Sequence, residues 1–318
     1  MAKVLFITSN RLGDAVLSTG VLGRLTELYP EARFTVACGP VAAPLFRALP
    51  GLDRVIPFGK RRWSAHWVGL WARCAGDFWH LVVDLRNSAV SRLLPARRRI
   101  IASRLDETCH RVEHLAVVLG QERVPAPRLW FADADRAAAR ALIPEGGPVL
   151  ALGPAANWRG KTWRAERFAA LIAILTGPAG LLPGARVAVL AAEGEREQAR
   201  PVLEAIAPSR RIDLVGRTDP LVAGACLERC ALFIGNDSGL MHIAAAVGIP
   251  TLGLFGPSRP EHYAPWGRHC AVAGTAIPYR DLVWGPGYDP KTTDTLMDSL
   301  AIETVVTAAG DLWRRSGR

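Results

Sequence analysis

Short apolar runs, each followed by an amphipathic segment, recur along the whole chain, and this alternation restricts its fold more than any other feature. The runs that we predict to be strands are residues 4–8, 33–37, 80–85 and 99–102, then 149–152, 186–190, 211–214, 231–235 and 251–255. Between them lie helical patterns, the clearest at 14–28, which Pro30 ends. Nearly continuous apolar strands separated by helices are typical of parallel sheets covered on both faces. The alternation therefore predicts an α/β protein.

The 318 residues divide into two such blocks around a Pro/Gly-rich stretch at 143–148, which is suited to a linker. A chain of this length can form two domains, each with its own core. We therefore predict two Rossmann-like domains, residues 1–145 and 146–299, whose parallel sheets face each other across a cleft. A final helix is expected at 300–315, within a C-terminal segment 300–318. In open parallel sheets the ligand site lies at the carboxyl ends of the strands, so the residues just after each strand are the functional candidates.

The composition indicates a folded protein with an anionic partner. Half of the residues are apolar and 21% are charged, which excludes a disordered chain. The net charge of +10 favours nucleic acid, a membrane surface or a phosphorylated substrate, without choosing among them. The six cysteines form no CxxC pair, which favours reduced thiols in a cytosolic protein, and Cys226 and Cys230 are expected to be small buried hydrophobes. No signal peptide or membrane-spanning run is recognisable, so we expect a soluble or peripheral protein.

The strongest local signal is the turn that follows the run at 231–235. Asn236-Asp237-Ser238-Gly239 leads into a helix of small residues, where Asp237 or Ser238 can cap the first turn and Gly239 lets a ligand approach the backbone. The free N–H groups of such a turn form an anion site suited to a pyrophosphate. The alternative is an ordinary capped turn, which any fold of this class contains.

Two further candidates follow other strands of the second half. Lys161, in the loop after the run at 149–152, can neutralise a phosphate, although a loop lysine is usually only solvated. Glu193, after the run at 186–190, stands where acids of such folds accept hydrogen bonds from ribose hydroxyls. Its alternative role is that of a helix-start carboxylate that favours the helix dipole.

The first strand is followed by Arg11-Leu12-Gly13-Asp14 rather than by the GxGxxG pattern of a dinucleotide-binding turn. A single glycine followed by a carboxylate argues against a pyrophosphate at this turn, and it makes an NAD-dependent dehydrogenase the least favoured class. Gly13 is expected to let the chain turn. Asp14 is expected either to face a substrate hydroxyl or to be only a helix-start carboxylate.

Two other patterns have both a functional and a structural interpretation. The HxxEH sequence at 110–114 matches the inverted zinc-protease motif, but zinc chemistry needs a third ligand and an open cleft, and an ordinary helix is favoured. Trp63, Trp67 and Trp71 share one helical face behind the basic cluster 60–62. For this face we favour a core-facing helix over a membrane interface or a grip on a large acceptor.

Four stretches, taken in order, resemble glycosyltransferase family 9, the bacterial heptosyltransferases of lipopolysaccharide-core synthesis. They are RLGDAVLST at 11–19, KTW at 161–163, DSGLMHIAAA at 237–246 and LFGPS at 254–258. The early Gly-Asp together with Asp-Ser-Gly-Leu-Met-His is specific, and the similarity covers essentially the whole chain. The resemblance implies a GT-B fold, with the acceptor bound mainly by the first domain, the nucleotide-sugar bound by the second, and the terminal helix packed back on the first.

The resemblance also implies roles for particular positions. Asp14 matches the proposed general base, with Gly13 and Arg11 beside it on the acceptor side, and Lys161 matches a lysine at the donor's phosphate and sugar. The donor turn is matched by Asp237, Ser238, Gly239, Leu240, Met241 and His242, and the nucleoside pocket, more loosely, by Glu193 and Thr218. The implied reaction inverts the anomeric centre and uses no metal or other cofactor.

The function so implied is transfer of a sugar, heptose from ADP-heptose, onto a hydroxyl of a lipopolysaccharide-core or related glycan. The expected partners are this nucleotide-sugar and an anionic lipid-linked acceptor, with no nucleic acid. The expected location is the cytoplasm, with peripheral contact at the cytoplasmic face of the inner membrane, which would also account for the positive charge. The alternatives are a nucleotide-sugar epimerase on the same fold and a basic nucleic-acid-binding protein. The second of these lacks a zinc finger, an RNP-like aromatic motif and a separate basic arm.

Overall fold

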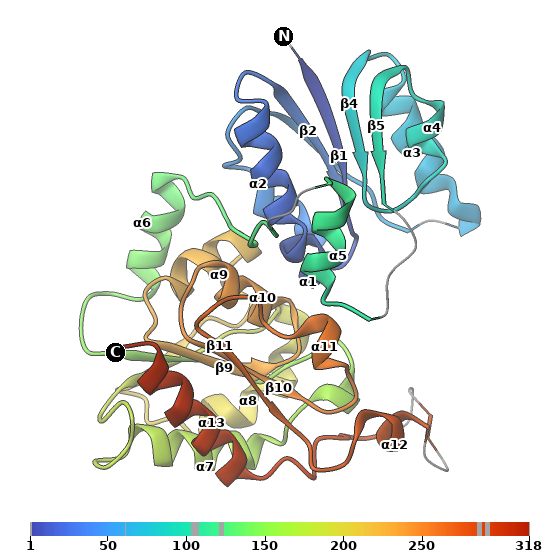
Figure 1. The fold of residues 1–318 in the computed structure, drawn as a ribbon. Helices are drawn as coiled ribbons and strands as arrows, with labels where there is room; N and C mark the ends of the chain where they lie inside the picture. Colours follow the sequence, from blue (N-terminus) through green and yellow to red (C-terminus); the bar gives the residue numbers. More distant parts are fainter. Residues whose placement is uncertain are drawn as a thin grey trace. The chain divides into compact units, whose positions relative to one another are not determined.

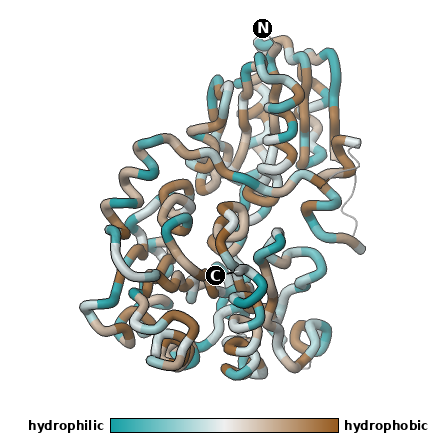
Figure 2. The backbone as a smooth tube through the Cα atoms, turned by 60° about the vertical axis from the view of Figure 1, so that its left-hand side comes forward, coloured by the Kyte–Doolittle hydropathy of each residue, from teal (hydrophilic) through white to brown (hydrophobic). Residues whose placement is uncertain are grey.

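The chain forms two compact units, Met1–Ala132 and Asp133–Arg318, each built on one parallel sheet (Figure 1). The structure is a computed structural model that describes residues 2–60, 62–102, 108–120, 124–284, 288–289 and 293–317. Apolar stretches recur along the chain between polar ones (Figure 2), and the central strands of the two sheets are buried apart from Lys3 in the first unit. The predicted α/β class with two parallel sheets is confirmed.

The first unit holds a five-stranded sheet in the order β3-β2-β1-β4-β5. Its strands are β1 (Lys3–Ile7), β2 (Arg33–Cys38), β3 (Leu52–Pro57), β4 (Trp79–Asp84) and β5 (Ala96–Ile101). The sequence did not predict β3, because this edge strand is largely exposed and shows no apolar run. The chain builds outward from β1 through β2 to β3 and then returns to β4 on the other side. The switch point of the sheet therefore lies between β1 and β4.

The helices of this unit are α1 (Leu12–Leu17), α2 (Thr19–Leu28), α3 (Ala65–Cys74), α4 (Val90–Leu93) and α5 (Arg111–Val118), with 3₁₀ turns η1 (Pro40–Phe46) and η2 (Arg62–Ser64). The single helix predicted at 14–28 is wrong: two helices meet at Ser18. The Ser18 hydroxyl bonds to Thr8 Oγ1 at 2.7 Å and donates to the carbonyl of Ala15, which ties the junction to the end of β1. Gly13 lies within α1, so it is not the turn residue that we expected.

The second unit holds a six-stranded sheet in the order β11-β10-β9-β6-β7-β8. Its strands are β6 (Val149–Gly153), β7 (Arg186–Val189), β8 (Arg211–Asp213), β9 (Leu232–Asn236), β10 (Thr251–Phe255) and β11 (Cys270–Gly274). The unpredicted strand is again at an edge: β11 is only partly buried. The switch point lies between β6 and β9, where Gly153 pairs with Gly235.

The helices of the second unit cover both faces of this sheet. They are α6 (Asp133–Leu142), α7 (Ala165–Thr176), α8 (Arg196–Glu204), α9 (Pro220–Leu227), α10 (Gly239–Ala246), α11 (Pro260–Tyr263), α12 (Tyr279–Val283) and α13 (Ile302–Arg315), with 3₁₀ turns η3 (Arg159–Lys161) and η4 (Glu193–Glu195). Among the described residues, none of these helices or those of the first unit has the length and apolar character needed to cross a membrane.

The boundary between the two units differs from the predicted one. The division falls between residues 132 and 133 rather than at 145, because α6 packs on α9 and Arg136 pairs with Glu228 at 3.1 Å. The stretch predicted to be a linker is held to the second unit, where Arg186 donates to the carbonyls of Pro144 and Gly147.

The terminal helix α13 was expected to pack on the first domain. It belongs to the second unit, and its apolar side faces β10, β11 and α7. Val305, Ala309 and Leu312, spaced at helical intervals along that side, are fully buried in the core of the second unit.

Two of the predicted structural interpretations hold in detail. Cys226 and Cys230 are buried, and burial raises the pKa of the Cys226 thiol to about 12, so both behave as small hydrophobes. His110 is the N-cap of α5: its Nδ1 accepts from the N–H of Val112, and Glu113 accepts from the N–H of His110. The HxxEH pattern therefore forms a capping box, which is an ordinary way to begin a helix.

Candidate functional site

A pocket of about 340 Å³ lies at the carboxyl ends of β1 and β4, at the switch point of the first sheet. Thr8 and Ser9 follow β1, while Leu85 and Arg86 follow β4. The other lining residues are Asn10, Arg11, Asp14, Ser18, Lys60, Arg111 and Leu115. The sequence predicted Asp14 and Arg11 at a functional site, and the structure places both in this pocket. Gly13 lies next to them in the first turn of α1.

Asp14 is held at the pocket by the loop that follows β1. Ser9 Oγ accepts from the N–H of Arg11 at 3.1 Å and donates to Asp14 Oδ2 at 3.4 Å. A neighbouring loop passes so close that a Cβ at Gly39 would lie 2.5 Å from the Cα of Asn10. The tight packing of these loops fixes the backbone from which Asp14 projects.

The pocket is strongly basic. Arg11, Lys60, Arg86 and Arg111 line it together with Asp14, which is the one carboxylate among its lining residues. Such a cluster of cations attracts anionic groups of a ligand.

The position of Arg86 depends on the buried carboxylate of Asp84, at the end of β4. Asp84 accepts hydrogen bonds from the N–H of Arg86 and from the N–H and Oγ of Ser88, at 2.6–2.8 Å. These bonds fix the turn that presents Arg86 to the pocket. Lys60, Arg86 and Arg111 were not predicted as site residues from the sequence. The signal that could have found Arg86 is its position just after a predicted strand.

In the second unit, Lys161 and Asp237 form an ion pair at the carboxyl ends of β6 and β9. Lys161 Nζ lies 2.5 Å from Asp237 Oδ2, with side chains 23% and 7% exposed. The backbones of β6 and β9 approach each other closely at this point, since a Cβ on Gly235 would lie 2.8 Å from the carbonyl oxygen of Gly153. Lys161 and Asp237, predicted from separate motifs, therefore meet at the switch point of this sheet.

The helix that begins at Gly239 offers free N–H groups beside this pair. Ser238 is its N-cap residue but makes no side-chain cap, and neither does Asp237, which pairs with Lys161 instead. The capping role predicted for these two residues is therefore wrong. The Ser238 hydroxyl is buried with no hydrogen-bond partner among the described residues. The buried Ser238 hydroxyl and the N-terminus of α10 therefore lie close to the ammonium group of Lys161. Such an arrangement is suited to binding an anion.

The other predicted donor-side residues lie in two places. Leu240 is half-buried in the first turn of α10, while Met241 and His242 are buried, and Met241 is packed so closely on β10 that a Cβ at Gly253 would lie 2.5 Å from its Sδ. Glu193 and Thr218 lie in the segments that follow β7 and β8. The Glu193 carboxylate lies against Gly216, where a Cβ would come within 1.8 Å of Oε2, and it pairs with Arg196 at 3.4 Å.

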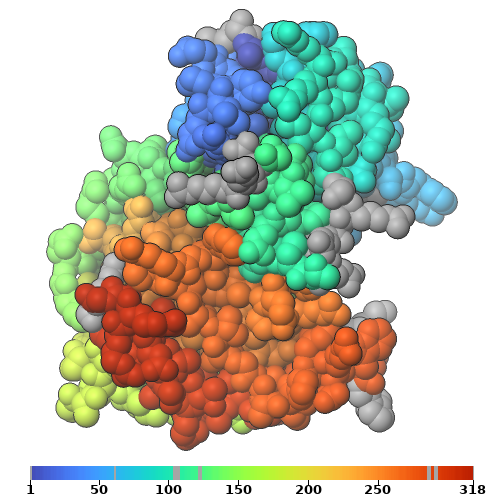
Figure 3. All heavy atoms as spheres, in the orientation of Figure 1, coloured from blue at the N-terminus to red at the C-terminus, as the bar shows by residue number. Residues whose placement is uncertain are grey.

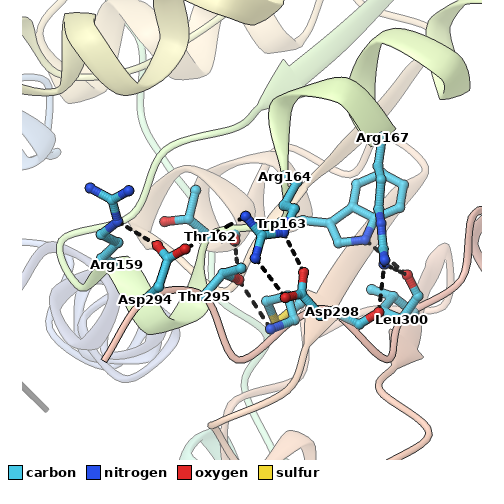
Figure 4. Close-up of polar contacts among 10 residues, drawn as sticks. Arg159, Thr162, Trp163, Arg164, Arg167, Asp294, Thr295, Asp298 and Leu300 are labelled. Atoms are coloured by element: carbon cyan, nitrogen blue, oxygen red, sulfur yellow. Dashed lines mark hydrogen bonds and ion pairs between the residues drawn. The ribbon is translucent and has the colours of Figure 1, made fainter. Parts of the chain in front are cut away.

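The loop that carries Lys161 is bound to the segment 294–300 by ion pairs of Arg159 with Asp294 and of Arg164 with both Asp294 and Asp298 (Figure 4). Arg164 makes a bidentate contact with Asp298 at 2.5 and 2.6 Å, and Arg159 pairs with Asp294 at 2.6 Å. The hydrogen bond from Arg164 lowers the pKa of Asp298, and that from Arg159 lowers the pKa of Asp294. Both carboxylates therefore stay ionised throughout the neutral range.

Neutral hydrogen bonds reinforce the same junction (Figure 4). Thr295 Oγ1 donates to the carbonyl of Thr162 at 2.5 Å, and Trp163 Nε1 donates to the carbonyl of Leu300 at 3.0 Å. From the other side, Asn236 accepts from the N–H of Trp163 at 3.1 Å. The backbone on either side of Lys161 is thus fixed both to β9 and to the segment 294–300. The segment 294–300 was not predicted as part of the site, because no local motif marks it.

The bidentate pair gives a testable prediction. Replacing Asp298 by Asn should raise the KM for the donor about three- to tenfold, since an exposed pair contributes about 1 kcal/mol, while kcat changes little. Because the pKa of Asp298 is lowered, the pair is intact above its depressed pKa, and the effect should be the same from about pH 5 to pH 9. Steady-state kinetics at several pH values measures both quantities.

A matched control exists in α13. Asp311 pairs with Arg314 at 2.5 Å in a similarly exposed position, so Asp311→Asn removes an ion pair of the same kind without touching the Lys161 loop. It should leave the donor KM unchanged. A lower Tm for Asp298→Asn with a wild-type KM would show that Arg164 and Asp298 serve the fold alone.

Two doubly wound units, each with candidate functional groups at its switch point, form a fold of the GT-B type. The sequence profile of glycosyltransferase family 9 (heptosyltransferase) matches residues 105–281, and the chain belongs to this family. It is therefore a glycosyltransferase.

Individual relatives extend this finding to nearly the full length. Lipooligosaccharide heptosyltransferase 2 of Haemophilus ducreyi is 26% identical over 95% of this chain and 98% of its own. Among solved structures, the family 9 glycosyltransferase of Veillonella parvula has a TM-score of 0.78 at 21% identity, covering 98% and 97% of the two chains. ADP-heptose lps heptosyltransferase II of E. coli has a TM-score of 0.75 at 20% identity, covering 99% and 100%. These structural likenesses show the fold.

Proposed function

We propose that the chain transfers heptose from ADP-heptose to a hydroxyl of a lipopolysaccharide-core acceptor. The observation that carries this proposal is the pair of Lys161 and Asp237 beside the N-terminus of α10, in a chain of glycosyltransferase family 9, the heptosyltransferase family. The structurally similar E. coli enzyme is named for ADP-heptose and lipopolysaccharide. Binding of this nucleotide-sugar would place a diphosphate where the second unit offers an ammonium group, a buried hydroxyl and free N–H groups.

We further propose that Asp14 is the general base and that the pocket of the first unit takes the acceptor. The attacking hydroxyl loses a proton as it bonds to the anomeric carbon, and a carboxylate within hydrogen-bond reach can accept that proton. Arg11, Lys60, Arg86 and Arg111 suit an acceptor that carries anionic groups. Glu193 and Thr218 are the residues that we propose for the nucleoside pocket.

The leaving nucleoside diphosphate accumulates negative charge, which Lys161 and the N–H groups of α10 can stabilise. The proposed reaction therefore takes its positive charge from the protein and needs no metal, so EDTA should leave its rate unchanged. We propose that the reaction inverts the anomeric carbon, which requires the base and the leaving phosphate to act on opposite faces of the sugar. The anomeric configuration of the product, determined by NMR, tests this point.

A thermal-shift panel tests the donor. ADP-heptose should raise the Tm, while UDP- and GDP-sugars should not, because a ligand that binds only the native state stabilises it by mass action. Incubation with donor alone then addresses the epimerase alternative: the sugar should be recovered unchanged. An epimer formed without acceptor, or a Tm raised only by another nucleotide-sugar, would overturn the proposal.

A further inference from the structure

The helix α3 carries apolar residues on the side that faces solvent. Leu70 and Cys74 are buried in the core of the first unit, whereas Val68, on the side away from them, is 68% exposed and Trp71, at the border of the buried side, is 41% exposed. The other exposed positions of this helix are Ala65, Gly69, Ala72 and Arg73, so Arg73 is its one exposed charged residue. A surface helix of a globular protein normally shows charged or polar residues at its exposed positions. The core-facing interpretation of the three tryptophans is thus correct only for Trp67, which packs on Phe58 with ring centroids 5.2 Å apart.

The apolar surface continues onto α4. Val90 and Leu94 belong to the same core cluster as Leu70 and Cys74, so α3 and α4 cover the same face of the sheet. On the outer side of α4, Leu93 is 69% exposed. At the other end of the surface, in η2, Trp63 is 87% exposed. We call Trp63, Val68, Trp71 and Leu93 the α3–α4 face. Its η2 end projects from the edge of the first unit (light blue in Figure 3).

The same part of the chain holds most of the net positive charge. Ten of the Lys and Arg residues but only two of the Asp and Glu residues lie between residues 54 and 102, against a net charge of +10 for the whole protein. Of the two acids, Asp84 is fully buried and Asp77 pairs with Lys3 and Arg54. The exposed cations near the α3–α4 face, among them Arg62 and Arg92, therefore attract an anionic partner.

We infer that the α3–α4 face docks on an anionic lipid bilayer. Exposed tryptophan and aliphatic side chains bordered by arginines match the boundary between headgroups and acyl chains. A second copy of this chain would place the same excess of positive charge against itself, which disfavours a symmetric dimer through this face. The inference rests on the proposed function only in that a lipid-linked acceptor brings the enzyme to a membrane.

Vesicle sedimentation of the full-length chain tests the inference. The wild type should sediment with vesicles of phosphatidylcholine and phosphatidylglycerol at low salt, but not with phosphatidylcholine alone, and about 0.5 M salt should release it. The double variant Val68→Ser/Trp71→Ser should bind at least about tenfold more weakly, since it removes the apolar contacts but no charge. As a matched control, Ile174→Ser/Trp284→Ser removes one exposed aliphatic and one exposed tryptophan from the second unit and should bind like the wild type.

Two further readouts separate this inference from the proposed function. The Tm shift caused by ADP-heptose should be identical in the double variant and the wild type, which also shows that the variant is folded. Equal vesicle binding by the double variant and the wild type would overturn the docking surface, whatever the donor proves to be. The docking surface would also be overturned if the double variant changed its oligomeric state, measured by light scattering, but kept its lipid binding.

Discussion

Asp14→Asn should lower the rate of sugar transfer about 10²- to 10⁴-fold, the usual contribution of a general base, and leave the affinity for the nucleotide-sugar unchanged. The substitution keeps the shape of the side chain and its contact with Ser9 but removes the proton acceptor from the basic pocket. Measurement of kcat at saturating acceptor, with donor binding followed by calorimetry, gives both quantities.

The alternative role of Asp14 predicts a different result. A carboxylate in the first turn of α1 also favours the helix dipole, and its loss would then cost about 0.5 kcal/mol of stability with no effect on turnover. Asp53→Asn, at an exposed carboxylate of β3 in the same unit, controls for the loss of one negative charge. Wild-type turnover in Asp14→Asn would remove Asp14 from the mechanism.

The sequence predicted the central strands because their positions carry continuous apolar runs. It missed β3, which includes Asp53 and Arg54 and therefore lacks an apolar run. It missed β11 as well, although the short stretch Cys270–Gly274 is apolar in sequence and is only partly buried in the fold. The other two edge strands, β5 and β8, overlap predicted runs. The sequence-based prediction also failed where tertiary contacts override a local pattern. The helical periodicity of 14–28 continues through Ser18, but bonds from Ser18 to Thr8 and Ala15 mark a junction between two helices.

The candidate sites show the same limit. Asp14, Lys161 and Asp237 each follow a strand within a recognisable motif, and the structure places each at a switch point. The residues that hold or complete these sites have no such local signal. Asp298 lies more than a hundred residues from its partner Arg164, and only the path of the chain brings them together. Contacts of this kind depend on the folded topology and cannot be found from spacing.

Lys161→Ala should lower kcat/KM about 10²- to 10³-fold, the usual effect of removing one group that stabilises transition-state charge. Two causes could contribute to this loss. Lys161 is proposed to contact the donor phosphate, but it also neutralises Asp237, whose side chain is only 7% exposed. A carboxylate left buried without its partner would repel the diphosphate and destabilise the second unit.

The double variant Lys161→Ala/Asp237→Ala separates these causes, because it removes the ammonium group and the buried carboxylate together. If Lys161 acts on the donor, the double variant should stay as inactive as Lys161→Ala, although its Tm recovers. Lys3→Ala is the matched control: it breaks another lysine–aspartate pair, with Asp77 at 2.5 Å and at the amino end of β1, and should leave transfer unchanged. Recovery of both donor binding and turnover in the double variant would mean that Lys161 only neutralises Asp237, and the diphosphate would then depend on the N-terminus of α10 alone.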